Sequence, residues 1–292
     1  THLGYNPDKA NNLFKDTKKI ITKVFFLYFF ITSLIFILFT LSGIRLFNSF
    51  NLAMTISSAG AFLPTNELSS LIKSPTQNII FTIGLIFSVL NIYFFYSLFS
   101  ISNTLKRHYE DILILFAVIF FSLILFFSIG KITFLNTFTN VVSSLSNSGL
   151  SSYSPPDNFY LFFIFLTMVG GSVISNSSGI KLIRLYILFK SFVLEVFKLV
   201  SPNVVLDQNI LRTEHKINNE NINLSFLIFI CFFISIFLLS SALSAGGINF
   251  ENSFKLSILT ITNTATSSLC GLEEVDFSNL LTSSKFFLIL FM

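Results

Sequence analysis

The sequence predicts an all-α integral membrane protein built from repeated units, and three observations lead to this prediction. Of its 292 residues, 53% are hydrophobic and only 11% are charged, whereas soluble domains carry about 25% charged residues. Several apolar runs are long enough to cross a hydrocarbon layer of roughly 30 Å as helices. Between these runs a mixed segment with the same internal pattern recurs three times.

The apolar runs set the expected order of elements. After a polar, basic stretch (1–23), we expect membrane spans over residues 24–44, 79–101, 112–129, 159–189 (interrupted), 224–245 and the beginning of one at 285–292. These spans define three units, 24–101, 102–189 and 224–292, with a polar linker at 190–223 that includes a surface helix over 192–200. Because the first residue is Thr1 and Met292 lies inside an apolar run, we expect a fragment of a longer protein.

The mixed segments share fixed spacings. Each opens with a similar triplet: Asn48-Ser49-Phe50, Asn136-Thr137-Phe138 and Asn252-Ser253-Phe254. Eleven residues beyond each Phe stands a minimal side chain (Ala61, Gly149, Ala265), and three residues before that stands a hydroxyl (Ser58, Ser146, Thr262). Each segment therefore predicts a short apolar helix that is too brief to cross the bilayer and returns as extended chain, a re-entrant pore loop.

Such loops suit a monovalent cation. Rings of backbone carbonyl and hydroxyl oxygens can replace the water shell of an alkali ion without a carboxylate. Small residues allow several loops to approach one axis. The alternative is that the hydroxyl and amide side chains only pack neighbouring helices together, as is common in membranes.

The interrupted run contains a second special feature. Helical character stops at Gly170-Gly171, ten mostly small or polar residues follow, and an apolar helix resumes behind Lys181 and Arg184. Irregular backbone at membrane depth is tolerated only where protein buries it or it lines a watery cavity. A lysine at that depth needs a partner, water or a pathway.

Basic residues predict the orientation, and missing motifs exclude other functions. Most Lys and Arg residues lie in 1–23, 102–111 and 181–223, so these segments are expected in the cytoplasm and the pore loops outside.

No phosphate-binding loop, HExxH, GxSxG or Cys/His cluster is present, so we expect neither an enzyme nor a bound cofactor. No basic and aromatic surface pattern indicates nucleic acid as a partner.

Three stretches resemble a known family: LFNSFNLAMTISSAGAF (46–62), FLNTFTNVVSSLSNSGLSS (134–152) and, most closely, VGGSVISNSSGIKLIR (169–184). They are similar to the membrane subunit of the Trk/Ktr/HKT potassium transporters, of the TrkH type. Members of that family carry four helix–pore loop–helix repeats around one ion pathway, as in K⁺ channels. The resemblance implies that this chain holds the second, third and most of the fourth repeat.

The resemblance also implies a function and its site residues. It implies potassium uptake across the cell inner membrane, with K⁺ as the transported ion, a homodimer in the lipid bilayer, and a cytoplasmic nucleotide-binding (TrkA-like) regulatory subunit. The implied selectivity filter is Ser58, Ala59, Gly60, Ala61, Ser146, Asn147, Ser148, Gly149, Thr262, Asn263, Thr264 and Ala265. The implied intramembrane gate is Gly170, Gly171, Ser172, Ser175, Asn176, Ser177, Ser178, Gly179 and Lys181.

Four positions depart from the family pattern. The filter glycine is kept only as Gly149, with Ala61 and Ala265 in the other loops, and two gate glycines are replaced by Ile174 and Ser178. Alanine keeps the carbonyl oxygen but resists a positive φ. The two alanine replacements leave open an alternative function, a non-conducting membrane scaffold or regulatory relative with a degenerate filter.

Overall fold

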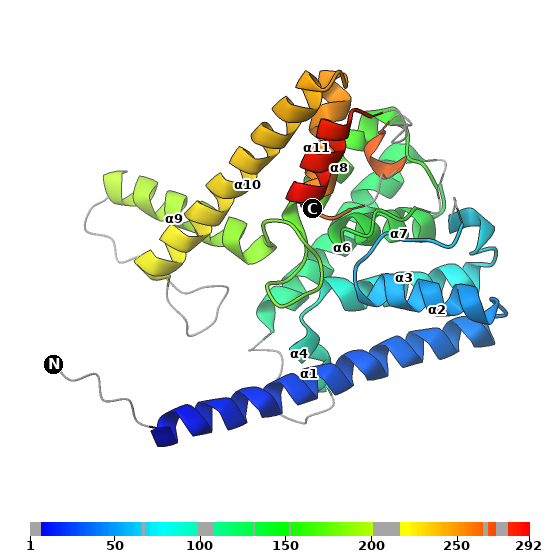
Figure 1. Cartoon of the computed structure of the whole chain (residues 1–292), viewed down its shortest axis with the longest axis horizontal. Helices are drawn as coiled ribbons and strands as arrows, with labels where there is room; N and C mark the ends of the chain where they lie inside the picture. The colour runs from blue at the N-terminus through cyan, green and yellow to red at the C-terminus, as the bar shows by residue number, and fades with distance from the viewer. Residues whose placement is uncertain are drawn as a thin grey trace.

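The structure, a computed structural model, describes residues 7–65, 68–98, 108–130, 132–151, 153–200, 217–264, 268–272 and 280–292. Within these residues all regular elements are helical, which confirms the predicted fold class (Figure 1). The longer helices are α1 (Pro7–Leu41), α2 (Leu46–Ser57), α3 (Pro75–Val89), α4 (Ile92–Leu98), α6 (Tyr109–Ile129), α7 (Phe134–Leu145), α8 (Tyr160–Val169), α9 (Leu182–Val200), α10 (Asn219–Ala245), α11 (Phe250–Ile261) and α12 (Thr282–Phe291). Short 3₁₀ turns are η1 (Leu68–Ser70), η2 (Asp157–Phe159) and η3 (Ser268–Cys270).

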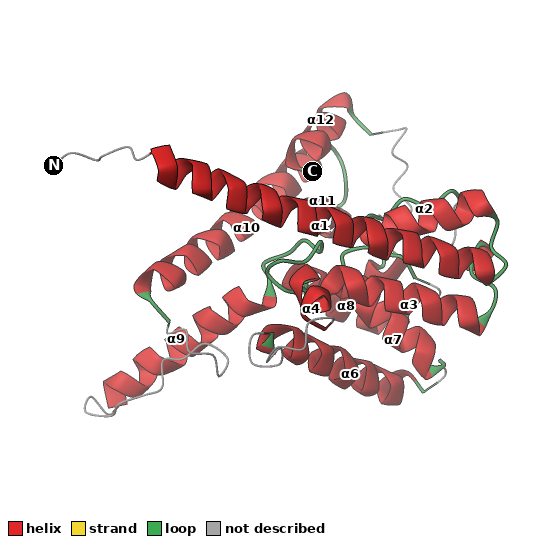
Figure 2. Ribbon diagram, turned by 90° about the horizontal axis from the view of Figure 1, so that it is seen from below, coloured by secondary structure: helices red, strands yellow, loops and turns green. Residues whose placement is uncertain are grey.

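The helices form three units with the same packing. In each unit an outer helix (α1, α6 or α10) packs against a pore helix (α2, α7 or α11), which packs against a following helix (α3, α8 or α12). The following helix also contacts the next pore helix, since α3 packs on α7 and α8 on α11 (Figure 2). The three pore helices have 12 residues each, which is about 18 Å and only part of a bilayer's depth.

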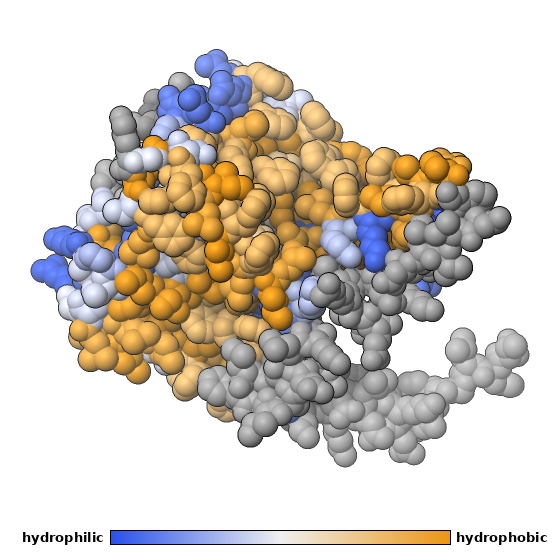
Figure 3. All heavy atoms as spheres, turned by 180° about the vertical axis from the view of Figure 1, so that it is seen from behind, coloured by the Kyte–Doolittle hydropathy of each residue, from blue (hydrophilic) through white to orange (hydrophobic). Residues whose placement is uncertain are grey.

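Three helices of the described chain are long and apolar enough to cross a membrane: Ile21–Leu41 within α1, Tyr109–Ile129, and Asn219–Ala245. They leave large apolar side chains exposed, Phe25 and Phe29 on α1 and Phe116 and Phe127 on α6 among them. Apolar side chains cover much of the coloured surface in Figure 3. A surface of this kind is stable in lipid rather than in water.

Two expected helices differ in the structure. The run 79–101 is not one span, because α3 ends at Val89, Leu90 is extended (ψ 160°) and α4 begins at Ile92. At the break the Asn91 backbone N–H donates to Asp111 Oδ1 at 2.8 Å, and its side chain caps α4 by accepting from Tyr93 N at 2.9 Å. The expected surface helix over 192–200 is the second half of the continuous helix α9.

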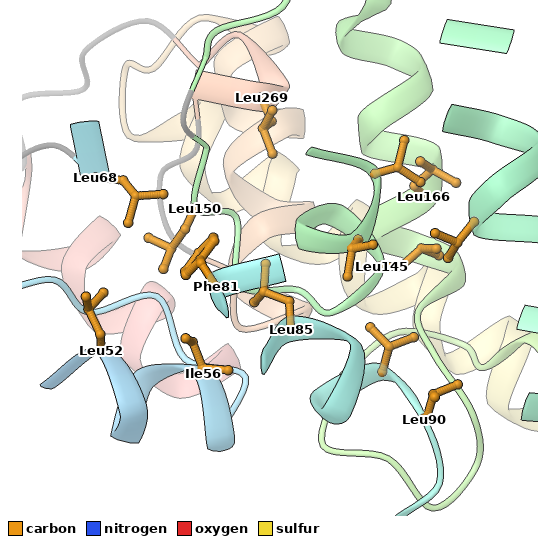
Figure 4. Packing of buried hydrophobic residues seen from close by; sticks show 14 of the residues in the cluster. Leu52, Ile56, Leu68, Phe81, Leu85, Leu90, Leu145, Leu150, Leu166 and Leu269 are labelled. Atoms are coloured by element: carbon orange, nitrogen blue, oxygen red, sulfur yellow. The ribbon is translucent and has the colours of Figure 1, made fainter. Parts of the chain in front are cut away.

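The main core lies where the first two units meet. Leu52 and Ile56 of α2, Phe81 and Leu85 of α3, and Leu145 of α7 converge there (Figure 4). Leu68, Leu150 and Leu269, which follow the three pore loops, belong to the same cluster. The core therefore fixes both the pore helices and the chain that returns from them.

Candidate functional site: three pore loops and an intramembrane segment

The three pore helices end in the same backbone conformation. The predicted filter hydroxyls Ser58, Ser146 and Thr262 cap their helices with φ of −87°, −75° and −84°. The next residue in each loop is left-handed: Ala59 (φ 52°), Asn147 (φ 62°) and Asn263 (φ 54°). Non-glycine residues rarely adopt this conformation, so its repetition shows that the loops share one backbone design.

Two of the loops complete the same hydrogen-bond pattern. After α2, Ala59 N donates to Ile56 O at 3.2 Å and Gly60 N to Thr55 O at 2.8 Å. After α11, the equivalent bonds run from Asn263 N to Thr260 O at 3.0 Å and from Thr264 N to Leu259 O at 2.8 Å. This pair of bonds is a Schellman motif, which ends a helix and satisfies its last carbonyls.

The middle loop replaces part of this pattern with hydroxyl bonds. Ser146 Oγ lies 3.0 Å from Ser148 Oγ, and Gly149 N donates to Ser143 O at 3.4 Å. Gly149 has a positive φ of 64°, which explains the glycine at this position. Its counterpart Ala61 is absent from the positive-φ residues of the described chain, so the alanine is accommodated there without left-handed strain.

A side-chain tether holds two of the returning segments to their pore helices. Thr55 Oγ1 donates to Phe62 O at 2.5 Å, and the equivalent Ser143 Oγ donates to Leu150 O at 2.5 Å. Each hydroxyl stands three residues before the filter hydroxyl of its loop. In the third loop that position is Leu259, which has no hydroxyl to donate.

Sequence reasoning missed the turns that lead into the pore helices. Gly43, Gly130 and Gly247 all have positive φ (89°, 65° and 89°) just before α2, α7 and α11. Each of these glycines stands seven or eight residues before the Phe of its triplet, and this regular spacing is the sequence signal that would have predicted the turns. The triplet serines have a related role, since Ser49 Oγ and Ser253 Oγ donate to Ile44 O (3.2 Å) and Ile248 O (3.1 Å) in these turns.

The first and third loops face a common cavity, whereas the middle loop is buried. The cavity has a volume of about 790 Å³, and its lining includes 58–62 from the first loop, Asn263 and Thr264 from the third, and Lys285 of α12. Ser146, Asn147 and Ser148 are at most 1% exposed and do not line it. Ala265 lies outside the described residues, so the structure does not place this predicted filter position.

The predicted gate, residues 170–181, is a closed loop between α8 and α9. Ile180 N donates to Met168 O and Lys181 N to Val169 O, both at 2.9 Å, so the loop returns to the helix that it left. Gly170 has φ 68° and ψ −170°, a conformation open essentially only to glycine. A Cβ there would lie 2.1 Å from Ser178 O, and one at Gly179 would lie 2.8 Å from Met168 O.

Lys181 closes this loop from inside. Its side chain is buried, and its Nζ donates to Ser175 Oγ at 3.1 Å, to Ser177 Oγ at 3.3 Å and to the carbonyl of Ser177. The backbone of Lys181 is left-handed, with φ 76°. The partners that a buried lysine requires are therefore oxygens of the gate segment itself.

The gate segment is attached to the end of α3 and the start of α6. Ser172 N donates to Val89 O at 3.0 Å and Asn176 N to Ser88 O at 3.2 Å. These are terminal carbonyls of α3, which have no partner within the helix. From α6, Glu110 Oε1 accepts from Val173 N at 3.0 Å. The carbonyls at the break in the run 79–101 thus find their donors in a segment about eighty residues further along the chain.

Side chains also join the predicted gate segment to the end of α2, next to the predicted filter. Asn176 Nδ2 donates to the carbonyl of Ser57, the last residue of α2 before filter residue Ser58, while Tyr28 Oη of α1 donates to Asn176 Oδ1. Asn147 Nδ2 of the predicted filter donates to Thr167 O of α8, the helix that leads into the predicted gate, at 2.7 Å. Sequence reasoning identified Asn176 and Asn147 but missed Tyr28, a polar residue in an apolar run, and Glu110, one of several charged residues in the polar segment 102–111.

Comparison with known proteins places this geometry in context. No family model matches the chain. An uncharacterized cation transporter of Methanocaldococcus jannaschii is 25% identical over 244 residues, which are 78% of this chain and 48% of that protein. The chain therefore spans about half the length of this curated relative.

A solved structure shows the same architecture over nearly the whole chain. The crystal structure of the potassium transporter TrkH from Vibrio parahaemolyticus superposes with a TM-score of 0.83 and 19% sequence identity, covering 94% of this chain and 61% of that one. The repeated helix–pore loop–helix units are thus those of a known membrane fold. These comparisons confirm the resemblance inferred from the sequence: the chain has the fold of the Trk/Ktr/HKT-type transporters.

Proposed function

We propose that the full-length protein carries K⁺, and monovalent cations more generally, across the cytoplasmic membrane through a pathway lined by the pore loops. The observation that carries this proposal is the shared helix end, a hydroxyl residue followed by a left-handed residue, in all three loops. The fold that carries these three loops is that of a solved potassium transporter. A shared loop geometry is expected where several loops face one ion, and packing between helices does not require it.

The chemistry of the loops is that of weak cation binding. Each pore helix directs its C-terminal carbonyls, which carry a partial negative charge, toward its loop. The loops add hydroxyl and backbone oxygens, which are the ligands an alkali ion accepts in place of water. Among the described residues no group of three or more His, Cys, Asp or Glu could hold a metal ion, so these oxygens are the candidate ligands.

We assign the gate to residues 170–181. The segment closes on α8 and is attached to α3, α6 and α2, which fits a closed state of the pathway. Opening would break the bonds to Ser88 and Val89 and release Asn176 from Ser57. Because Ser57 precedes the filter, movement of the gate would also change the last turn of α2.

The finer assignments belong to the same proposal. The units 24–101, 102–189 and 224–292 would be the second to fourth of four repeats, with the loops outside and 1–23, 102–111 and 181–223 in the cytoplasm. The full-length protein would form a homodimer in the inner membrane and bind a cytoplasmic nucleotide-binding regulatory subunit. Basic segments on one side support the orientation.

Uptake of Rb⁺ or K⁺ tests the proposal. Cells that lack their own K⁺ uptake systems should grow at low K⁺ and accumulate Rb⁺ when they express the full-length protein. Failure of both, with normal amounts of protein in the membrane, would contradict the proposal and favour the alternative, a non-conducting scaffold. Ala61 and Ala265 motivate that alternative, and the unstrained backbone of Ala61 is an argument for conduction.

A further inference from the structure

The third pore loop lacks the tether that holds the first two. Thr55 and Ser143 bind the carbonyls of Phe62 and Leu150, at 2.5 Å each, whereas Leu259 occupies the equivalent place on α11. An apolar side chain cannot donate a hydrogen bond. The described part of the segment that returns from the third loop is 268–272, and a bond to it from another residue of α11 is the alternative.

Lys255 supplies a different attachment, one helical turn before Leu259. Its Nζ donates to the carbonyl of Gly271 at 3.0 Å, in the returning segment, and pairs with Glu251 Oε1 at 2.6 Å. The Lys255 side chain is 14% exposed, while that of Glu251 is 76% exposed. Because the lysine is largely shielded from water, its bond to Gly271 is worth more than a surface contact.

The same ammonium reaches the neighbouring unit. Lys255 Nζ lies 5.9 Å from the centre of the Tyr160 ring, at the start of α8. Gly271 has φ 57°, and a Cβ there would come within 2.0 Å of that ring, so the returning segment passes directly against Tyr160. Lys255 thus joins α11, its returning segment and α8 at one point.

No equivalent cation stands in the other two pore helices. Lys255 directly follows the Phe of its triplet, and the residues at the same position in α2 and α7 are Asn51 and Thr139. Lys255 also lines a polar cavity of about 500 Å³, together with Asp157, Glu251, Asn249 and Asn252. The third loop therefore differs from the others both in its attachment and in its charge.

We propose that Lys255 is a positioning residue that fixes the third filter loop through the Gly271 carbonyl and thereby sets the preference of the pathway among monovalent cations. The proposal rests on the proposed function, because it assigns the third loop, described over 262–264, to the ion pathway. It needs no contact between Lys255 and the ion, since the lysine acts through the position of the loop.

Selectivity is the first readout. Lys255→Met keeps the length and apolar stem of the side chain but removes the donor, and we expect the Rb⁺/Na⁺ uptake ratio of the full-length protein to fall roughly five- to tenfold. Lys255→Arg, which restores a cationic donor, should recover most of the ratio. The matched control is Lys198→Met, because Lys198 also pairs with a glutamate at 2.6 Å but is exposed on α9; it should leave the ratio unchanged.

The second readout is independent of transport. Cys270, next to Gly271, is fully buried, and burial raises the pKa of its thiol to about 12, so it should react slowly with a maleimide. In a Cys231→Ser background, Lys255→Met should label at Cys270 at least about tenfold faster, while Lys198→Met and Lys255→Arg should stay near the rate of the parent.

The two readouts separate the two proposals. A parent protein that carries no Rb⁺ would contradict the proposed function, while Cys270 labelling would still decide whether Lys255 holds the loop. Unchanged labelling in Lys255→Met would overturn the positioning role. Faster labelling with an unchanged Rb⁺/Na⁺ ratio would overturn the role in selectivity, and a lower ratio in Lys198→Met would show that the effect is not specific to Lys255.

Discussion

The pore loops and the gate segment are both irregular chain inside a membrane fold, but they are held in opposite ways. The loops are fixed by bonds to their own pore helix, such as those from Thr55 to Phe62 and from Ser143 to Leu150, seven residues apart. The gate segment has bonds to α8 as well, but it is also held by side-chain and backbone groups far away in the sequence. Glu110 binds it across 63 residues, Ser57 across 119 and Tyr28 across 148.

This difference indicates which part can move. Local bonds hold most of the shape of the first two loops, as a site that selects ions by geometry requires. The long-range bonds of the gate segment are few, and one displacement would break them together. Substitutions in the gate should therefore change opening, whereas substitutions in a loop should change that loop alone.

The largest effect should come from Gly170→Ala. A Cβ at Gly170 would lie 2.1 Å from the backbone oxygen of Ser178, and the residue has a glycine-only conformation. We expect a loss of about 3 kcal/mol or more in the stability of the closed structure, measured as a lower thermal unfolding midpoint of the purified protein in detergent.

Gly43→Ala is the matched control for this change. Gly43 also has a positive φ, 89°, but no atom lies within 4 Å of the added Cβ. Only backbone strain remains there, so the loss should be about 1 kcal/mol. Equal losses in the two variants would contradict the close packing assigned to the gate segment.

Asn176→Ala should weaken the bond between gate and filter. It removes the donor to the Ser57 carbonyl and the acceptor for Tyr28. If these bonds stabilise the closed state, basal Rb⁺ uptake should rise roughly tenfold. Tyr28→Phe removes only the bond to Asn176 Oδ1 and should give a smaller rise in basal uptake. A larger rise from Tyr28→Phe would show that Tyr28 stabilises the closed state through contacts other than Asn176.

Ser143→Ala should loosen the middle loop alone. The carbonyl of Leu150 would lose its donor in a buried place, at a cost of about 1–2 kcal/mol. We expect a lower unfolding midpoint and a changed Rb⁺/Na⁺ ratio, without the rise in basal uptake expected for Asn176→Ala. A variant with raised basal uptake and an unchanged ratio would show that the tether acts on the gate.

The smallest effect, and one of opposite sign, is expected for Ala59→Gly. Ala59 has φ 52° at the end of α2, so glycine should stabilise the protein by about 0.5–1 kcal/mol. Ala53→Gly, inside the same helix, should destabilise it by at least ~0.5–1 kcal/mol. Thermal unfolding of both variants measures the contrast, and destabilisation by both would mean that Ala59 is not strained.

The comparison of loops and gate also explains what the sequence can predict. The pore helices and loop offsets follow from the local triplets, and Gly170-Gly171 marks the interruption, because local chemistry determines these features. At the break after Val89 the local signal is only the capping residue Asn91, and the carbonyls of Ser88 and Val89 are satisfied by Asn176 and Ser172 from far along the chain. For the same reason, Tyr28, Glu110 and the Lys255–Gly271 bond appear only once the chain is folded.

The most direct test of the central claim, that the loops line the cation pathway, is Rb⁺ uptake by Gly149→Asp. A carboxylate in the middle loop should hold the cation too tightly for release, and uptake should be abolished at a normal amount of protein in the membrane. Gly130→Asp is the control, since Gly130 has nearly the same φ (65° against 64°) in a turn outside the loops, and it should retain uptake. Unaltered Rb⁺ uptake by Gly149→Asp would contradict the assignment of this loop to the ion pathway.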